Sequence, residues 1–412
     1  MLFPEASSIL SGSYEFRSSG GWLLGASKSL LLHRNVKLIV VTESPLVNKL
    51  TKLEGKEITY FIIPVCRNKR KRSNYITFWQ TINSEVNPDI VHIHGTEYSS
   101  GYEYMQACGT NKVVISIQGL MSACGNYYNY GISNIDIFLS LTLRDLIKGT
   151  LWMQKRRFIQ VSKIESAMIR NAHHIIGRTS WDKERVWAIN PNAQYHFCNE
   201  ILRDEFYDGS LWDYNKCIKH SIFLSQAGYP IKGLHQLLKA MPIILNYYPD
   251  TVIRIAGNDI LTRNCLFDYF RFSGYAKYIK RLIKKLNLES HVIFTGNLNA
   301  EGMKREYLSA NIFVCPSSIE NSPNSLGEAQ ILGTPCVASY VGGVSDMMSG
   351  CENNLYRYED IDALAYKICN VFAEQRNANI QVVANALNRH DSVNNTNQLF
   401  SVYERILNEN QD

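Results

Sequence analysis

The sequence predicts an α/β fold made of two domains, each with a parallel sheet. Apolar segments typical of buried strands, such as 36–42 and 88–95, alternate with helical segments. The alternation stops in a polar stretch at 203–219 and starts again with the strand SIFLSQAG. Because strands that alternate with helices pair in parallel, we expect two such sheets, joined at this polar stretch. The expected units are residues 1–205 and 206–395, followed by a C-terminal helix at 396–412 that could pack back on the first domain.

Composition places the chain among globular proteins. It has 412 residues, of which 45% are apolar and 19% charged, and no apolar run approaches the ~20 residues of a membrane-spanning helix. The formal charge of 43 − 37 = +6 is too weak and too spread to indicate nucleic acid binding. A mildly basic chain instead suits anionic substrates and an anionic membrane surface.

The cysteines and the N-terminus indicate a reduced, cytoplasmic setting. The ten cysteines are scattered and form no CxxC pair, so we expect neither a disulfide framework nor a metal site. Pro4 and Glu5 interrupt the N-terminus almost at once, which argues against a signal peptide.

A glycine-rich turn at Gly20 and Gly21 opens the first long helix, as it does in nucleotide-binding α/β domains. Such a turn normally follows a full strand of ~5–6 residues, but only about three residues remain for it here. We therefore expect the first strand to be short or missing, or the gene to start upstream of Met1. A tight packing turn explains the glycines as well as a ligand loop does.

Two polar side chains end strands of the first half. His94 lies near the end of the strand 88–95, and Gln118 lies near the end of the strand 112–120. Ligands of α/β sheets collect at the carboxyl ends of the strands, so both residues are candidates for the substrate side. A purely structural histidine is equally consistent with the sequence.

Two basic segments have two interpretations each. RNKRKR at 67–72 is by default a solvated loop, and otherwise a rim that faces a membrane or an anionic acceptor. The segment 135–159 is mostly apolar and helical, and a membrane-surface segment explains it as well as a helix packed over the first domain. Its basic residues are Arg144, Lys148, Lys155, Arg156 and Arg157.

The most informative stretch is Cys315–Asp346, a strand, loop, helix and strand in succession. Its loop carries Glu320, and its helix, expected to begin near Ser325, carries Glu328 in the first turn. The N-terminus of a helix attracts phosphate, whereas carboxylates accept hydrogen bonds from hydroxyl groups. The stretch therefore predicts a nucleotide-sugar site, with phosphate on the amides and sugar or ribose hydroxyls on the two carboxylates.

Other strand ends of the second half fit the same site. Lys232 follows one strand and could place its ammonium on a diphosphate, where it would neutralise charge on the leaving group. Gly257 ends the next strand and lets a ligand approach the backbone. Asn297 and Leu298 follow a third strand and could edge the base.

Paired carboxylates also suggest a glycoside hydrolase, with one acid and one base or nucleophile. Glu328 argues against this reaction, because it lies on a helix that opens beside the expected phosphate amides. Those amides would stabilise its ionised form and make it a poor acid.

The stretch SSIENSPNSLGEAQILGTPCVASYVGGVSD resembles the E-x7-E region of retaining GT-B glycosyltransferases of glycosyltransferase family four. Glu320 and Glu328 are eight residues apart, and Gly342, Gly343 and Asp346 match the ending of the motif. The segments FLSQAGYPIKG, PDIVHIHG and SSGGW resemble its diphosphate turn, fourth-strand motif and N-terminal glycine loop. The resemblance covers nearly the whole chain and implies two Rossmann-like parallel-sheet domains facing across a cleft.

The resemblance also implies roles and partners. Glu320 would contact the donor sugar and Glu328 the ribose, while Lys232 and the residues Asn324, Ser325 and Leu326 would bind the diphosphate, with Gly228 in the adjoining turn. It implies transfer with retention from a nucleotide-diphosphate sugar, without a metal or other cofactor. The acceptor would be a saccharide or lipid-linked saccharide of surface polysaccharide biosynthesis, reached at the inner face of the cell membrane.

Three departures from the family pattern keep a second hypothesis open. Ala227 stands where the family has an arginine, Gln118 stands where it often has a histidine, and the first strand is nearly absent. A non-catalytic or N-terminally truncated nucleotide-sugar-binding homologue is therefore the alternative, and a hydrolase or epimerase using the same cleft is a weaker one.

Overall fold

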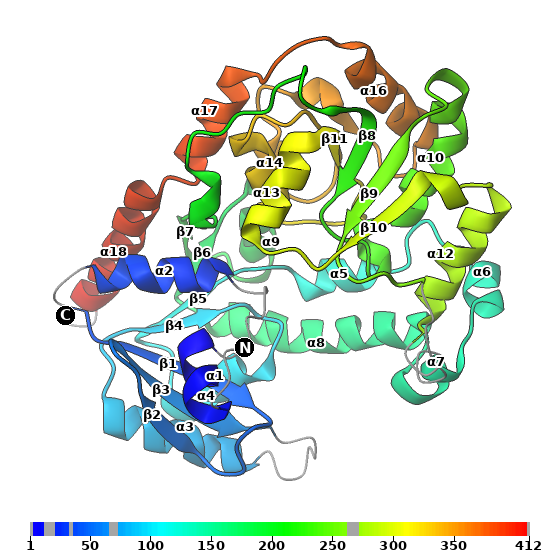
Figure 1. Ribbon diagram of the computed structural model, residues 1–412. Helices are drawn as coiled ribbons and strands as arrows, with labels where there is room; N and C mark the ends of the chain where they lie inside the picture. Colours follow the sequence, from blue (N-terminus) through cyan, green and yellow to red (C-terminus); the bar gives the residue numbers. More distant parts are fainter. Residues whose placement is uncertain (1–2, 12–20, 33–35, 66–72, 262–271, 410–412) are drawn as a thin grey trace.

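The computed structural model describes residues 3–11, 21–32, 36–65, 73–261 and 272–409 (Figure 1). The first half alternates strands and helices as the sequence predicts. Its elements are α1 (Pro4–Ser11), α2 (Gly21–Leu31), β1 (Leu38–Ser44), β2 (Thr51–Glu54), β3 (Ile58–Pro64), α3 (Ser73–Val86), β4 (Val91–His94), α4 (Ser99–Cys108), β5 (Val113–Ser116), α5 (Met121–Tyr127), α6 (Asn134–Leu139), α7 (Leu143–Lys148), α8 (Leu151–Asn171), β6 (His174–Gly177), α9 (Ser180–Ile189), β7 (Gln194–Phe197) and η2 (Asp204–Phe206).

The first half departs from a single parallel sheet. Its described strands form a three-stranded sheet, β1-β3-β2, and a four-stranded parallel sheet, β4-β5-β6-β7. In the smaller sheet β2 runs antiparallel to β3, because only a tight turn at Gly55 separates them and a parallel pair needs a long crossover. The predicted parallel pairing holds for β1 with β3 and for β4 through β7, and β2 adds an antiparallel strand beside β3.

No described residue ahead of α2 lies in a strand. Instead Pro4 begins α1, and proline at the first helical position presets the backbone for a helix. Glu5 fastens this helix to the small sheet, since its carboxylate accepts hydrogen bonds from the Lys56 amide and the Tyr60 hydroxyl, both at 2.8 Å.

The second half has one parallel sheet in the order β10-β9-β8-β11-β12-β13, as predicted. The central strand β11 is buried along its whole length. The elements are β8 (Ile218–Leu224), η3 (Pro230–Lys232), α10 (Leu234–Tyr247), β9 (Val252–Ala256), α12 (Gly274–Lys285), η4 (Glu289–His291), β10 (Val292–Gly296), α13 (Ala300–Ser309), β11 (Ala310–Cys315), α14 (Asn324–Ile331), β12 (Cys336–Ser339), α15 (Val344–Met347), η5 (Glu352–Asn354), β13 (Leu355–Tyr356), α16 (Ile361–Ala373), α17 (Ile380–Arg389) and α18 (Ser392–Glu409).

The C-terminal helix α18 lies beside the first half in space (Figure 1). Its residues Val402 and Ile406 are buried in one apolar cluster with Val114 of β5 and Ile176 of β6. The Tyr403 hydroxyl lies 2.7 Å from the His92 ring. The chain thus crosses back over the boundary expected at residue 205, and this last helix ties the two halves together.

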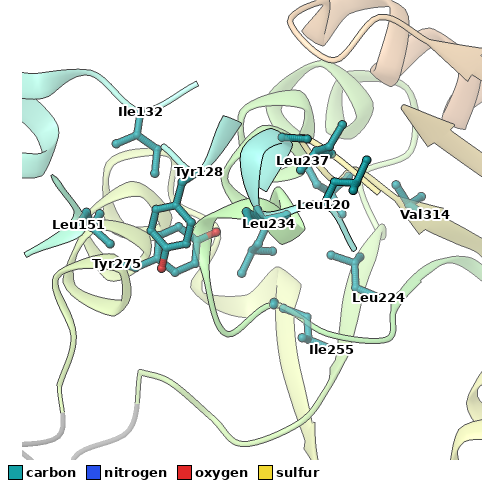
Figure 2. Packing of buried hydrophobic residues seen from close by; sticks show 14 of the residues in the cluster. Leu120, Tyr128, Ile132, Leu151, Leu224, Leu234, Leu237, Ile255, Tyr275 and Val314 are labelled. Carbon is teal, nitrogen blue, oxygen red and sulfur yellow. The ribbon is translucent and has the colours of Figure 1, made fainter. Parts of the chain in front are cut away.

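Apolar side chains also join the halves directly (Figure 2). Leu120, Tyr128 and Leu151 belong to the same buried cluster as Leu234 of α10 and Tyr275 of α12. The packing fixes the segment after β5 against the helices of the second half. None of the described helices combines the length and the apolar character needed to cross a membrane.

Candidate donor site between the two halves

A cavity of about 380 Å³ opens at the carboxyl ends of β8, β9 and β10 and at the start of α14. This is the edge of a parallel sheet at which ligands of α/β proteins bind. Its lining mixes two cationic side chains with a carboxylate, amides and a few apolar groups. The lining residues are Leu202, Arg203, Ser225, Gln226, Lys232, Ala256, Gly257, Asn297, Leu298, Met303, Asn324, Ser325 and Glu328.

The cavity collects most of the residues that the sequence assigned to the donor. Those that line it are Lys232, Gly257, Asn297, Leu298, Asn324, Ser325 and Glu328. Glu320 and Gly228 do not line it, although Glu320 contacts Lys232 and the exposed Gly228 lies in the turn before it. The residues come from four separate loops, so the fold, and not sequence proximity, brings them together.

Lys232 and Glu320 form an ion pair at the edge of the cavity. The Lys232 Nζ lies 2.6 Å from Glu320 Oε1, and the Ser317 hydroxyl donates to the same oxygen at 2.7 Å. Burial disfavours the charge on Lys232, but the Glu320 carboxylate outweighs it and raises the pKa of the lysine above its ordinary value. Lys232 is therefore charged at neutral pH and available to an anion.

The glycine pair of the motif holds the Glu320 loop in place. A Cβ on Gly342 would lie 1.9 Å from the Glu320 carbonyl oxygen, and Gly342 has a φ of +53°. The Gly343 amide donates to the same carbonyl at 3.1 Å. Only glycine permits this close approach, which explains why the motif carries two glycines after its second strand.

Arg203 and Glu328 form a second ion pair, which the sequence analysis missed. The Nε of Arg203 donates to Glu328 Oε1 at 2.9 Å, and Nη2 lies 2.8 Å from the same oxygen. The Tyr307 hydroxyl donates to the other carboxylate oxygen at 3.3 Å. The guanidinium also lies over the Phe206 ring, 4.9 Å from its centroid. Arg203 lies in the polar stretch between the halves, where no strand or helix pattern marked it.

The pKa of Glu328 moves opposite to the expectation from sequence. Burial raises it, although Arg203 and Tyr307 act in the other direction. The reasoning that helix amides keep this carboxylate ionised was wrong, because Glu328 is the fifth residue of α14 and lies beyond the first-turn amides. Of the contacts that oppose the effect of burial, the charge of Arg203 is the strongest.

The start of α14 supplies part of the predicted phosphate site. Pro323 precedes the helix and offers no side-chain hydrogen bond to its first turn. Asn324 and Ser325 face the cavity, and the Asn324 amide donates to Glu200 at 2.6 Å. Leu326 does not fit its expected role, because its side chain is fully buried and its amide donates to the Pro323 carbonyl at 2.9 Å.

Ala227, the position at which the resembled family has an arginine, is buried and does not line the cavity. Arg203 brings a guanidinium to the same cavity from a different loop. The cavity consequently has two cations, as a site for a diphosphate requires, although one of them comes from an unexpected position.

A second, smaller cavity of about 60 Å³ lies at the strand ends of the first half. His94, Gln118 and Arg178 line it together with residues of α2 and α18. The Gln118 Nε2 is buried without a hydrogen-bond partner among the described residues, so it has a free donor for a ligand. Gly20 lies outside the described residues, and Gly21 is the first residue of α2.

His94 faces solvent at this cavity but behaves as a neutral ring. Desolvation by the surrounding protein, and after it the charge of Arg178, lowers the pKa of the His94 ring below its ordinary value. It also stacks on His92, with ring centroids 3.9 Å apart. At neutral pH His94 can donate or accept a hydrogen bond without carrying charge.

Polar contacts join the two halves beside the cavities. The Asn321 amide donates to Asp182 at 2.8 Å, and the Thr179 hydroxyl donates to Asn321 at the same distance. Asp346 accepts hydrogen bonds from the Ser180 amide at 2.5 Å and from the Ser180 hydroxyl at 2.8 Å. These hydrogen bonds fix the position of the loop that carries Glu320 relative to the first half.

The fold is that of a two-domain α/β protein, with a cavity in its second half that two cationic side chains and a carboxylate line. Residues 219–388 match the family described as "Glycosyl transferases group 1". A glycosyltransferase of Methanocaldococcus jannaschii, MJ1607, is 27% identical over 157 residues, which cover 38% of this chain and 36% of that protein. A GDP-mannose-dependent alpha-(1-6)-phosphatidylinositol monomannoside mannosyltransferase of Mycolicibacterium smegmatis is 26% identical over 174 residues, 40% of this chain and 41% of that one.

Solved structures match along almost the whole chain. The sucrose-phosphate synthase of Thermosynechococcus elongatus has a TM-score of 0.68 at 16% identity, and the match covers 94% of this chain and 93% of that one. Anabaena Alr3699/HepE, solved in complex with UDP, has a TM-score of 0.61 at 15% identity, with 95% and 98% covered. These likenesses confirm the predicted GT-B architecture with two Rossmann-like domains.

Proposed function

We propose that the protein is a retaining glycosyltransferase that moves a hexosyl group from a nucleotide-diphosphate sugar to a saccharide or lipid-linked saccharide, in surface polysaccharide biosynthesis. One observation carries the proposal. A single cavity at the strand ends brings together Lys232, Arg203, Glu328 and the start of α14, with Glu320 behind Lys232. Two cations suit a diphosphate, and carboxylates held beside them suit the hydroxyl groups that flank it.

Each pair has a distinct part in this proposal. Lys232 and Arg203 hold the diphosphate and stabilise the charge that grows on it as the glycosidic bond breaks. Glu328 accepts hydrogen bonds from the ribose, and Glu320 accepts them from the donor sugar while it positions Lys232. Asn297 and Leu298 also line the cavity and would contact the base.

Transfer with retention follows from a front-face reaction in which the leaving phosphate takes the proton of the acceptor hydroxyl. Neutral Gln118 and neutral His94 orient the acceptor from the first half, and no side chain has to act as a base. The lysine and arginine stand in for a metal ion, so we propose that the reaction requires none.

The relatives support the nucleotide-sugar donor. Residues 219–388, which match glycosyl transferases group 1, contain nearly all the donor-side residues named above. A mannosyltransferase among the relatives is named as GDP-mannose-dependent, and one solved structure of the same fold holds UDP. In the first half, where the acceptor would bind, this chain shares only the fold with the solved structures. We propose that the reaction takes place at the inner face of the cell membrane.

The test is a turnover assay with a panel of UDP- and GDP-sugars, in which the released nucleoside diphosphate is measured. We expect one donor to be consumed with an acceptor and the product to keep the anomeric configuration, read by NMR. The Glu320→Gln variant should lose this activity while it still binds the nucleotide. Binding of nucleotide sugar without turnover by the unaltered protein would instead identify a non-catalytic binding protein, and release of free sugar without acceptor would identify a hydrolase.

A further inference from the structure

The segment between Ser133 and Gly149 exposes an unusual number of large apolar side chains. Six of them, on the two short helices α6 and α7, are between 50% and 77% exposed, namely Ile135, Phe138, Leu139, Leu143, Leu146 and Ile147. Apolar side chains on the surface of a monomer are usually scattered singly. We call these six side chains the apolar patch.

The fold holds the apolar patch in place. The capping box of α7 pairs Thr142 with the buried Asp145, whose carboxylate also accepts a hydrogen bond from the Gly274 amide at the start of α12, at 3.2 Å. Lys277 donates to the Leu141 carbonyl and Arg281 donates to the Ser140 hydroxyl, both at 2.9 Å. The exposed side chains therefore sit on a fixed scaffold beside α12, near the start of α8 (Figure 1).

The surroundings of the apolar patch are cationic. Residues 131–160 contain five lysines and arginines but only two acids, Asp136 and Asp145. Asp145 is buried, and Asp136 lies 3.8 Å from Arg281, so neither carboxylate is left to repel an anion. The neighbouring helix α12 has no acid at all, and its exposed face carries Lys280, Arg281, Lys284 and Lys285.

We propose that the apolar patch and the basic face of α12 form a docking surface for an anionic lipid bilayer. Apolar tips that enter the headgroup region and cations that remain at its surface are the combination that binds such membranes. A protein partner or a second copy of this chain would also cover apolar side chains. However, a surface with several cations and no free carboxylate complements an anionic membrane better than it complements a second copy of this basic surface.

The segment that leads into the apolar patch also contacts the second half, including the loop of Glu320. Tyr127, at the end of α5, accepts a hydrogen bond through its carbonyl from the Ser318 hydroxyl in the loop of Glu320, at 2.9 Å. The Tyr130 carbonyl likewise accepts a hydrogen bond from His235 Nε2 at 2.9 Å, and α6 begins four residues later. This placement rests on the proposed function and favours the lipid-linked acceptor over a free saccharide.

Co-sedimentation with vesicles tests the proposal. We expect the full chain to bind vesicles of phosphatidylcholine with phosphatidylglycerol and to bind those of phosphatidylcholine alone much less. The double variant Leu146→Ser, Ile147→Ser should bind at least about tenfold more weakly, because each side chain loses its burial in the membrane. The pair Lys280→Glu, Lys284→Glu should weaken binding to the anionic vesicles only.

A matched control uses two equally exposed aliphatic side chains elsewhere, Ile380 and Val393. The variant Ile380→Ser, Val393→Ser should bind vesicles as the unaltered protein does. Titration with UDP and GDP, followed by calorimetry, reports the donor site separately, so that its failure would count against the proposed function and leave the membrane result intact.

Two results would overturn the docking surface. One is binding to the anionic vesicles that the Leu146 and Ile147 changes leave unaltered. The other is no binding to either vesicle, together with a concentration-dependent dimer in sedimentation velocity that the same changes abolish, which would assign the apolar patch to a second copy of this chain.

Discussion

Arg203, in the segment between the two halves, donates a hydrogen bond from Nε to Glu328 Oε1 at 2.9 Å and places Nη2 2.8 Å from the same oxygen. The contact has two consequences. It opposes the effect of burial, which raises the pKa of Glu328. It also holds a guanidinium at the wall of the donor cavity, although Ala227 supplies none.

Arg203→Ala should weaken the use of the donor. The loss of hydrogen bonds from a charged group costs about 1.5–3 kcal/mol, so we expect kcat/KM for the nucleotide sugar to fall about tenfold to a hundredfold. Steady-state kinetics with varied donor would measure this. Arg203→Lys keeps the charge but not the fork of donors and should recover only part of the loss. An unchanged kcat/KM in the alanine variant would show that Arg203 neither binds the diphosphate nor holds Glu328 for the ribose.

Lys232 and Glu320 should separate stability from activity. In Lys232→Met the Glu320 carboxylate, with its side chain 14% exposed, loses its counter-charge, which costs about 3–5 kcal/mol and lowers the Tm. In the double variant with Glu320→Gln that charge is gone, so much of the Tm should return. Donor turnover should stay lost in both variants, since the leaving diphosphate has lost its cation. Turnover that returned together with the Tm would reduce Lys232 to a structural role.

Most of the donor half could be predicted from sequence, because its determinants are local. Buried parallel strands read as continuous apolar runs, and the residues that follow them, such as Gly257 and Asn297, must gather at one edge of the sheet. Glu320 and Glu328 stand out by their spacing around the start of one helix. The positions of these residues follow from the order of the strands, so they can be predicted without knowing any contact between distant segments.

The rest depends on contacts between segments far apart in the chain. Arg203 lies 125 residues from Glu328 in a stretch without periodicity, so no pattern could pair them. The burial of Leu326 and the raised pKa of Glu328 depend on the packing around α14, which a sequence window does not contain. The sequence also could not show that the apolar patch is exposed. Helices of six residues are too short for a periodicity that distinguishes a buried face from an exposed one.

Stability should fall between neutral and mildly acidic pH because of His235. The ring is fully buried, and burial lowers its pKa from 6.5 to about 3, although a hydrogen bond with the Tyr130 carbonyl acts in the other direction. The unfolded chain therefore binds this proton below about pH 6.5 while the folded chain does not, so stability is complete above that pH and is lost as the pH falls toward 3. One such group contributes about 2 kcal/mol between pH 7 and 5.

Urea unfolding at pH 7 and at pH 5 measures this dependence. His235→Gln should lower the stability at pH 7 and flatten the difference between the two pH values. The exposed His173→Gln, as the control, should leave that difference as it is in the unaltered protein. If His235→Gln kept the full pH dependence, a group other than His235 would bind the proton that is taken up on unfolding.

Asp346 should control how firmly the two halves hold together. Its carboxylate accepts hydrogen bonds from the amide and the hydroxyl of Ser180 at the start of α9. That helix has its own capping box from Thr179 and Asp182, so the loss of Asp346 leaves α9 intact and removes only the link between the halves. We expect Asp346→Ala to raise the radius of gyration in small-angle scattering and to lower kcat, while UDP or GDP binding changes little because Asp346 does not line the donor cavity.

A graded series makes this test sharper. Ser180→Ala removes one of the two hydrogen bonds and should give a smaller effect of the same sign. Ser349→Ala, at an exposed serine three residues after Asp346, serves as the control. A hydrogen bond to a charged group contributes about 1.5–3 kcal/mol when it is buried, and less at an exposed contact such as this one. We therefore expect only a small decrease in the Tm, whereas kcat should fall clearly. If the radius of gyration and kcat both stayed constant across the series, other contacts, such as those of Asn321 with Thr179 and Asp182, would be sufficient to keep the halves closed.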